Sequence, residues 1–152
     1  MSESRLTKNF IATEINPIVA TYFDLKDYLS AFISQARTVT HIETLLQPYL
    51  IPRQPSFAND LVPILKKLSA EDGAILTRFI SHHETIVRML SDTKQLNLDH
   101  AEVLFEKVVE GLQLLGDLLE KFNVDLILVT PRGQKIMAIQ KIRDPKFYEI
   151  II

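Results

Sequence analysis

The chain has 152 residues, of which 47% are hydrophobic and 24% are charged, and its formal net charge is −2. This length fits a single domain that holds enough apolar material for its own core. The chain contains no cysteine, which excludes disulfides, thiolate metal sites and a cysteine nucleophile. The small negative charge argues against strong attraction of the whole protein to nucleic acid or to an anionic membrane.

Nothing in the hydropathy pattern predicts membrane insertion or export. No apolar run approaches the roughly 18 residues that a membrane-spanning helix needs. Residues 1–14 lack the basic-then-apolar layout of a signal peptide. We therefore expect one soluble, cytoplasmic domain over residues 1–152, with a helical part at about 3–122 and a β part at about 124–152.

The N-terminal half of the chain reads as helical. A short helix is predicted up to Asn16, and Pro17 begins a second helix that extends to about Gln47. The second helix carries apolar residues at steps of three and four, namely Ile18, Tyr22, Leu25, Leu29, Phe32, Ala36 and Val39. We expect this seam in the core of a bundle, with an intermolecular coiled coil as the alternative.

Two further long helices follow a proline-rich connector at residues 48–55 and a short helix after Asp60. The first is predicted from about Ala70 to Leu90. The second begins after a cap at Asn97 or Asp99 and ends near residue 122, where Asn123 is a plausible left-handed terminator. Gly111 falls on the apolar side of this helix, which predicts a close helix crossing.

Beyond residue 123 the composition shifts toward β-branched residues. Segments 124–130, 135–142 and 146–152 are predicted as three consecutive antiparallel strands, separated by turn-forming residues around Pro131 and Pro145. The expected fold is thus α+β and mostly α. It consists of a bundle of four to five helices with a C-terminal three-stranded β-meander.

Two histidines on the helix at 70–90 are the first candidate site. His83 falls near the middle of the apolar face and His82 at its edge. We expect His83 to be buried and hydrogen-bonded within the protein. The alternative is a small-ligand or metal sensor centred on His82 and His83. Neither histidine has a histidine or carboxylate three or four residues away, so no metal site is predicted.

Arg78 and His83 form a second candidate site. Their Arg-x4-His spacing resembles the Arg-x4–6-His motif that all-helical RNases of the HEPN class carry on a bundle helix. The resemblance implies that Arg78 and His83 are catalytic residues of an RNA-cleaving enzyme. We keep this as an alternative function.

Charged residues suggest surfaces for partners. An acidic ridge follows one stripe of the last long helix, with the members Asp99, Glu102, Glu106, Glu110, Asp117 and Glu120. It is either a solvated face or a docking surface for a basic protein. Arg132 and Lys135 lie at a predicted hairpin tip and are further candidates for partner contact. Tips of this kind also use lysine against aggregation, and the absence of a stacking pattern makes nucleic acid an improbable partner.

The predicted meander is apolar on both faces, whereas one helical bundle covers one face. A second copy of the chain would cover the other face through Ile127, Val129, Met137, Ile139, Tyr148 and Ile150. The alternative cover is the N-terminal helix together with the connector at 48–55. The leading expectation is a non-catalytic, homo-oligomeric interaction, adaptor or regulatory protein that needs no cofactor.

Overall fold

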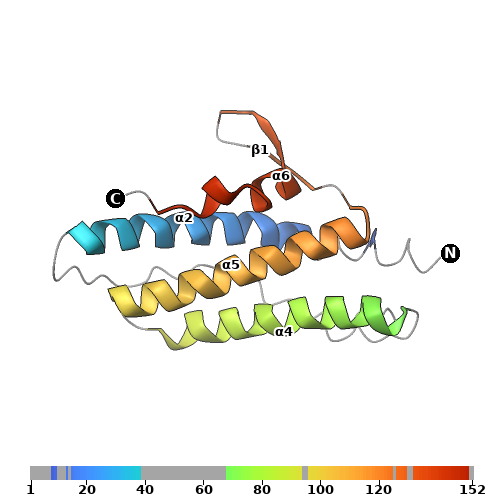
Figure 1. Ribbon diagram of the computed structural model, residues 1–152, viewed down its shortest axis with the longest axis horizontal. Coiled ribbons are helices and arrows are strands. Elements are labelled where there is room, and N and C mark those ends of the chain that lie inside the picture. Colours follow the sequence, from blue (N-terminus) through green and yellow to red (C-terminus); the bar gives the residue numbers. More distant parts are fainter. Residues whose placement is uncertain are drawn as a thin grey trace.

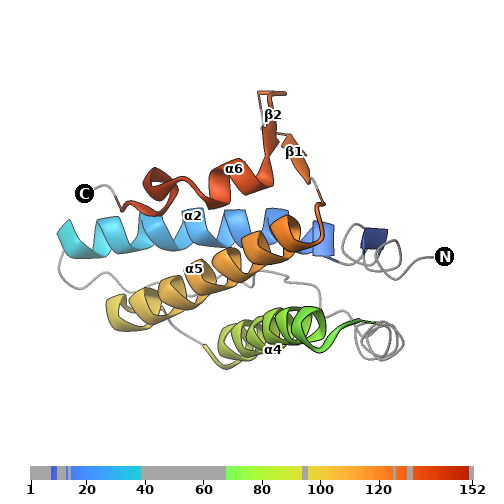
Figure 2. The same ribbon diagram turned by 45° about the vertical axis from the view of Figure 1, so that its right-hand side comes forward.

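The computed structural model describes residues 8, 9, 13, 15–38, 68–93, 96–124, 126–129 and 132–150. Its elements in chain order are α2 (Asn16–Thr38), α4 (Ala70–Asp92), α5 (Leu98–Lys121), β1 (Ile127–Val129), β2 (Lys135–Met137), α6 (Ala138–Ile142) and the 3₁₀ turn η2 (Pro145–Tyr148). Three long helices lie side by side with α5 between α2 and α4 (Figure 1). The short elements α6 and η2 cover α2 on the side away from α4, and the β1–β2 hairpin projects from the bundle (Figure 2).

The long helices begin and end where side chains satisfy their backbone groups. The Ser69 hydroxyl accepts the amide of Asp72 at the start of α4, and the Asn97 side chain accepts the amide of His100 at the start of α5. Asn123 adopts a φ of 53° just beyond α5, as expected for a left-handed helix terminator. The predicted helix at 70–90 is confirmed with two more residues at its C-terminal end.

Each long helix contributes one apolar stripe to a shared core. On α2, Ile18, Tyr22, Leu25 and Leu29 are fully buried within a single chain. The seam predicted from the sequence therefore forms bundle core, and it is not available for an intermolecular coiled coil. The core residues of α5 run along the whole helix, since α5 contacts both of the other long helices.

At Gly111, α2 and α4 both come close to α5. A β-carbon built there would lie 3.0 Å from Cε2 of Tyr22 on α2, and 3.2 Å and 3.3 Å from side-chain carbons of His82 and Ile86 on α4. These separations are below normal carbon contact distances. The predicted close crossing is confirmed, and it involves both neighbouring helices.

The β part is smaller than the sequence predicted. β1 and β2 pair antiparallel, with Leu128 opposite Ile136, but the predicted strand at 146–152 is wrong over its described residues, and the second strand ends at Met137. Residues 138–142 instead form α6, because Ala138 and Ile142 are one helical turn apart and both are buried. The Asp144 side chain caps η2 by accepting the amide of Lys146.

Several sequence predictions fall outside the described residues. These are most of the short N-terminal helix, the part of the second helix beyond residue 38, the connector at 48–55 and the short helix after Asp60. Among the described helices, none combines the length and hydrophobicity that crossing a bilayer requires.

Candidate functional site

The hairpin carries the most exposed large apolar side chains of the described residues. Ile127 is 53% exposed and Val129 is 66% exposed, and both belong to β1. Their cross-strand neighbours are Met137, which is half-buried, and Lys135, which is exposed. These four residues form one face of the hairpin, which we call the hairpin face.

The remaining residues of the predicted interface lie elsewhere. Ile139 belongs to α6, Tyr148 to η2, and Ile150 follows η2; all three are partly buried against the core. The predicted single apolar face of a three-stranded sheet is therefore wrong, because its last part folds as helix and packs on the bundle. Only Ile127, Val129 and Met137 of that set share a sheet face. Arg132 is exposed in the hairpin turn, as predicted.

The hydrogen-bond pattern of the hairpin leaves one edge of β1 without a paired strand in the described part of the chain. The amide of Ala138 donates to the carbonyl of Leu126 at 2.8 Å, and these residues lie directly opposite each other in the register that pairs Leu128 with Ile136. Hydrogen-bonded and non-hydrogen-bonded pairs alternate along an antiparallel ladder. The backbone groups of Leu126 and Leu128 therefore face β2, and those of Ile127 and Val129 point away from it.

A cavity of about 630 Å³ lies beside β1. It is lined by all three residues of β1, by Ile136 alone of β2, and by parts of α2, α6 and η2. In its wall the buried Lys26 places its ammonium 3.9 Å above the ring of Phe147 and 2.8 Å from a carboxylate oxygen of Asp27. Phe147 also packs on Phe23, at 4.9 Å between ring centres. These contacts hold η2 against α2.

Charged side chains of both signs line this cavity. Besides the ion pair of Lys26 and Asp27, the lining contains Lys141, Lys146, Asp24, Asp144 and Glu149, and none of these five forms an ion pair with another described residue. Within the described part of the chain, β1 thus borders two lysines and three carboxylates that have no ion pair.

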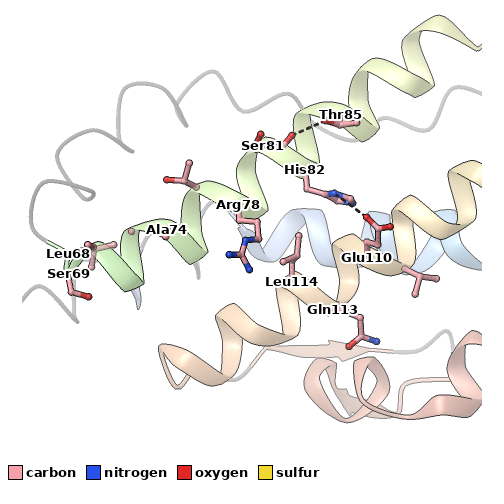
Figure 3. Close-up of a pocket in the computed structure, with 14 residues that line it drawn as sticks. Leu68, Ser69, Ala74, Arg78, Ser81, His82, Thr85, Glu110, Gln113 and Leu114 are labelled. Carbon is pink, nitrogen blue, oxygen red and sulfur yellow. Dashed lines mark hydrogen bonds and ion pairs between the residues drawn. The ribbon is translucent and has the colours of Figure 1, made fainter.

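A second cavity of about 1040 Å³ lies between α4 and α5 (Figure 3). From α4 and its N-cap it is lined by small or hydroxyl-bearing residues at intervals of four, namely Ser69, Gly73, Thr77, Ser81 and Thr85. Val109 and Leu114 of α5 supply apolar walls. Arg78 and His82 point from α4 toward α5, and Arg78 is exposed and has no ion pair within the described part of the chain.

His82 is held in a defined orientation in this second cavity. Its Nε2 donates to the carbonyl of Lys107 at 2.6 Å, so Nε2 carries a proton. Its Nδ1 faces a carboxylate oxygen of Glu110 at 3.9 Å, and Figure 3 shows this contact bridging the two helices. Glu110 also lies 3.8 Å from the ammonium of Lys107.

His83 occupies a different environment from His82. It is 2% exposed, and its Nδ1 is hydrogen-bonded to the hydroxyl of Tyr22 at 2.9 Å. Its ring stacks on Phe79, with ring centres 6.2 Å apart. The prediction of a buried, hydrogen-bonded His83 is confirmed. Burial raises the pKa of Tyr22, because the phenolate would lose its hydration in the core.

The Arg78–His83 pair is separated by this arrangement. Arg78 is exposed at the cavity between α4 and α5, whereas His83 lies in the core. A buried imidazole does not reach a polymeric substrate, so the geometry gives the RNA-cleaving alternative no support. Arg78 and His82 are four residues apart and therefore lie on the same face of α4, whereas His83 points about 100° away from His82. Arg78 consequently shares its cavity with His82.

The acidic ridge is exposed for the most part, and several of its carboxylates have partners within the chain. Glu102 lies 3.3 Å from the guanidinium of Arg37 on α2. Asp117 and Glu120 lie 2.7 Å and 3.0 Å from the guanidinium of Arg143 after α6, which also donates to Gln113. The hydrogen bond with Glu120 raises the pKa of Arg143. Of the six ridge residues, Asp99 and Glu106 have no ion pair with a described residue.

No cluster of three or more metal-ligating side chains occurs among the described residues. Two features of the candidate sites were missed from the sequence. The hydroxyl residues at intervals of four along α4 were a visible signal for the lining of the cavity between α4 and α5. Lys26 gave no such signal, because its burial depends on Phe147, which is far away in the sequence.

Comparison with known proteins yields no assignment. No protein-family model matches the chain, and neither the curated proteins nor the solved structures contain a significant match to it. Its function must be inferred from its own residues.

Proposed function

We propose that this protein is a non-catalytic interaction protein that self-associates through its β-hairpin. The single observation that carries the proposal is the exposure of Ile127 and Val129 on an element that projects from the bundle. Soluble proteins rarely leave contiguous apolar surface in water unless it meets a partner. Among the described residues, no strand pairs with the outer backbone edge of β1, which adds donors and acceptors at the same place.

The expected association is weak. Fully burying a valine or isoleucine side chain stabilises by about 1.5–3 kcal/mol, so each half-exposed residue adds roughly 1 kcal/mol. Two residues from each of two copies then contribute about 4 kcal/mol. Association itself costs at least about 4 kcal/mol. Hydrogen bonds and surrounding contacts must supply the net affinity, and a dimer should therefore form at micromolar rather than nanomolar concentration.

Light scattering coupled to size exclusion, run from about 5 to 500 μM, tests the proposal. The parent should shift from 17.4 kDa toward twice that mass as concentration rises. The variants Ile127→Asp and Val129→Asp should remain monomeric. Val103→Asp is the matched control. Val103 is 49% exposed on α5, so this substitution adds the same charge at a similarly exposed position away from the hairpin. A parent that stays monomeric at the highest concentration refutes the proposal.

A second candidate function is the binding of a small organic anion between α4 and α5. The observation that favours it is the presence of Arg78, which has no ion pair with a described residue, beside the oriented imidazole of His82 in one cavity with apolar walls. A guanidinium binds carboxylate and phosphate groups through paired hydrogen bonds. This is the small-ligand sensor alternative, with Arg78 and His82 as its residues.

Binding of benzoate and of inorganic phosphate, followed by NMR chemical-shift titration, tests this second candidate. Benzoate should bind more tightly than phosphate, because Val109 and Leu114 can contact its ring. Arg78→Gln should weaken binding about tenfold, as expected for the loss of a charged hydrogen bond. Arg88→Gln, which changes an exposed arginine of the same helix outside the cavity, should leave it unchanged. Equal effects of the two variants would contradict a specific site.

A further inference from the structure

Ile127 and Val129 direct their backbone groups away from β2, and Leu128 lies between them. This alternation of inward-facing and outward-facing backbone groups determines how a further strand can pair with the hairpin. A strand that pairs with this edge must place its own outward-facing backbone groups opposite those of Ile127 and Val129. The edge of a second β1 meets that requirement in one register. In it, Ile127 of each copy lies opposite Val129 of the other, and the two Leu128 residues face each other.

We propose that two copies of the chain join β1 to β1 in this antiparallel register, with a two-fold axis at Leu128, to form a four-stranded sheet. The proposal rests on the self-association proposed above and adds its geometry. Each Ile127–Val129 pair exchanges two backbone hydrogen bonds, which gives about four bonds across the axis. The contact is isologous, because each residue meets its counterpart in a closed pair.

A second copy fits the surroundings of the edge better than an unrelated charged partner. The three residues of β1 carry no charge, so the central pair of strands brings no like charges together. The cavity beside β1 is lined by two lysines and three carboxylates that have no ion pair with a described residue, in addition to the paired Lys26 and Asp27. A surface of one sign would repel its own copy strongly, whereas this lining carries both signs and a surplus of only one negative charge. The cavity also lies on the β1 side of the hairpin, since β2 contributes only Ile136 to it.

Single cysteines report the register, because the chain has no cysteine of its own. Residues of a non-hydrogen-bonded antiparallel pair have α-carbons about 4.5 Å apart, within the range that a disulfide spans. Leu128→Cys should therefore yield a disulfide-linked dimer under mild oxidation. In Ile127→Cys the two cysteines would be offset by two residues along the strands, at about 8 Å. That distance exceeds the disulfide limit of about 7 Å, so little cross-linking is expected.

A proline pair tests the edge without oxidation. Val129→Pro removes an amide that points away from β2, so it should abolish the dimer while the hairpin persists. Lys135→Pro is the matched control. Lys135 lies opposite Val129 in a non-hydrogen-bonded pair, and its amide points to the outer edge of β2. This variant should dimerise like the parent. Circular dichroism confirms that each variant remains folded.

The outcomes separate the two proposals. Cross-linking of Leu128→Cys above that of Ile127→Cys, together with loss of the dimer in Val129→Pro alone, supports β1–β1 pairing. A dimer that survives Val129→Pro, or that cross-links more readily at residue 127 than at residue 128, overturns the pairing and leaves self-association standing. A parent that is monomeric at all concentrations overturns both proposals.

Discussion

Tyr22→Phe removes one oxygen atom from the centre of the bundle. The hydroxyl of Tyr22 is hydrogen-bonded to Nδ1 of His83 at 2.9 Å, and both side chains are at most 2% exposed. Loss of one partner of a buried hydrogen bond costs about 1–3 kcal/mol, because the other partner loses this bond without gaining water. For a chain of this size, each kcal/mol lowers the melting temperature by about 2–4 °C.

Urea unfolding followed by circular dichroism measures this loss directly. The midpoint should fall while the slope stays constant, since the core keeps its shape. Tyr148→Phe is the control: its hydroxyl donates to the carbonyl of Ile142 from a half-buried position, so its removal should cost about 1 kcal/mol or less. If Tyr22→Phe changes the free energy of unfolding by less than about 0.5 kcal/mol, the buried hydrogen bond does not stabilise the fold as argued.

The difference in stability between the parent and Tyr22→Phe should also depend on pH in the alkaline range. Burial raises the pKa of Tyr22 in the folded state well above the ordinary tyrosine value of about 10. The stabilising contribution of the neutral phenol is therefore complete below pH 10 and is lost above it, because the unfolded chain ionises first. Above pH 10 the stability advantage of the parent over Tyr22→Phe should shrink by about 1.4 kcal/mol per pH unit. A constant difference up to pH 11.5 would contradict burial of the phenol.

Two further predictions concern helix packing. Gly111→Ala should gain about 1 kcal/mol from higher helix propensity. The new β-carbon would meet the buried Tyr22 at 3.0 Å, and such overpacking costs about 1–3 kcal/mol. We expect the free energy of unfolding in urea to fall by about 1 kcal/mol, and a rise would refute the close crossing. Arg143→Gln should lower stability by about 1 kcal/mol through loss of its pairs with Asp117 and Glu120. This second loss should diminish in about 1 M salt, and a salt-independent loss would point to packing instead.

Local chemistry alone predicted the helical part of the candidate sites well. Asn97 and Asn123 lie at helix ends because the side chain of the first and the backbone conformation of the second satisfy groups that the helix leaves unpaired. The period of 3.6 residues placed His83 inside the bundle and His82 at its edge. Such features depend on residues close together in the chain, and the sequence therefore carries them.

Pairings between distant residues were decided by the tertiary structure. Arg143 neutralises Asp117 and Glu120 of the acidic ridge from beyond α6, and no periodicity within α5 indicates this contact. Arg78 shares a cavity with His82 rather than with His83, because the rotation of α4 against α5 decides which side chains face the cavity between them.

The C-terminal segment shows most clearly what the sequence determined and what it left open. The β-branched composition of residues 124–130 was sufficient to predict β1, and the presence of apolar residues on both of its faces led to the prediction that Ile127 and Val129 lie on the face that the bundle does not cover; both are exposed. The residues after Met137 are compatible with a strand by composition and with a helix by the spacing of Ala138 and Ile142. The segment forms a helix because Gly116 of α5 lets α6 approach closely. A β-carbon built on Gly116 would lie 2.9 Å from the side chain of Ile142. Burial of both apolar residues on α5 outweighs the weak β preference of the segment, and that balance exists only once the bundle has formed.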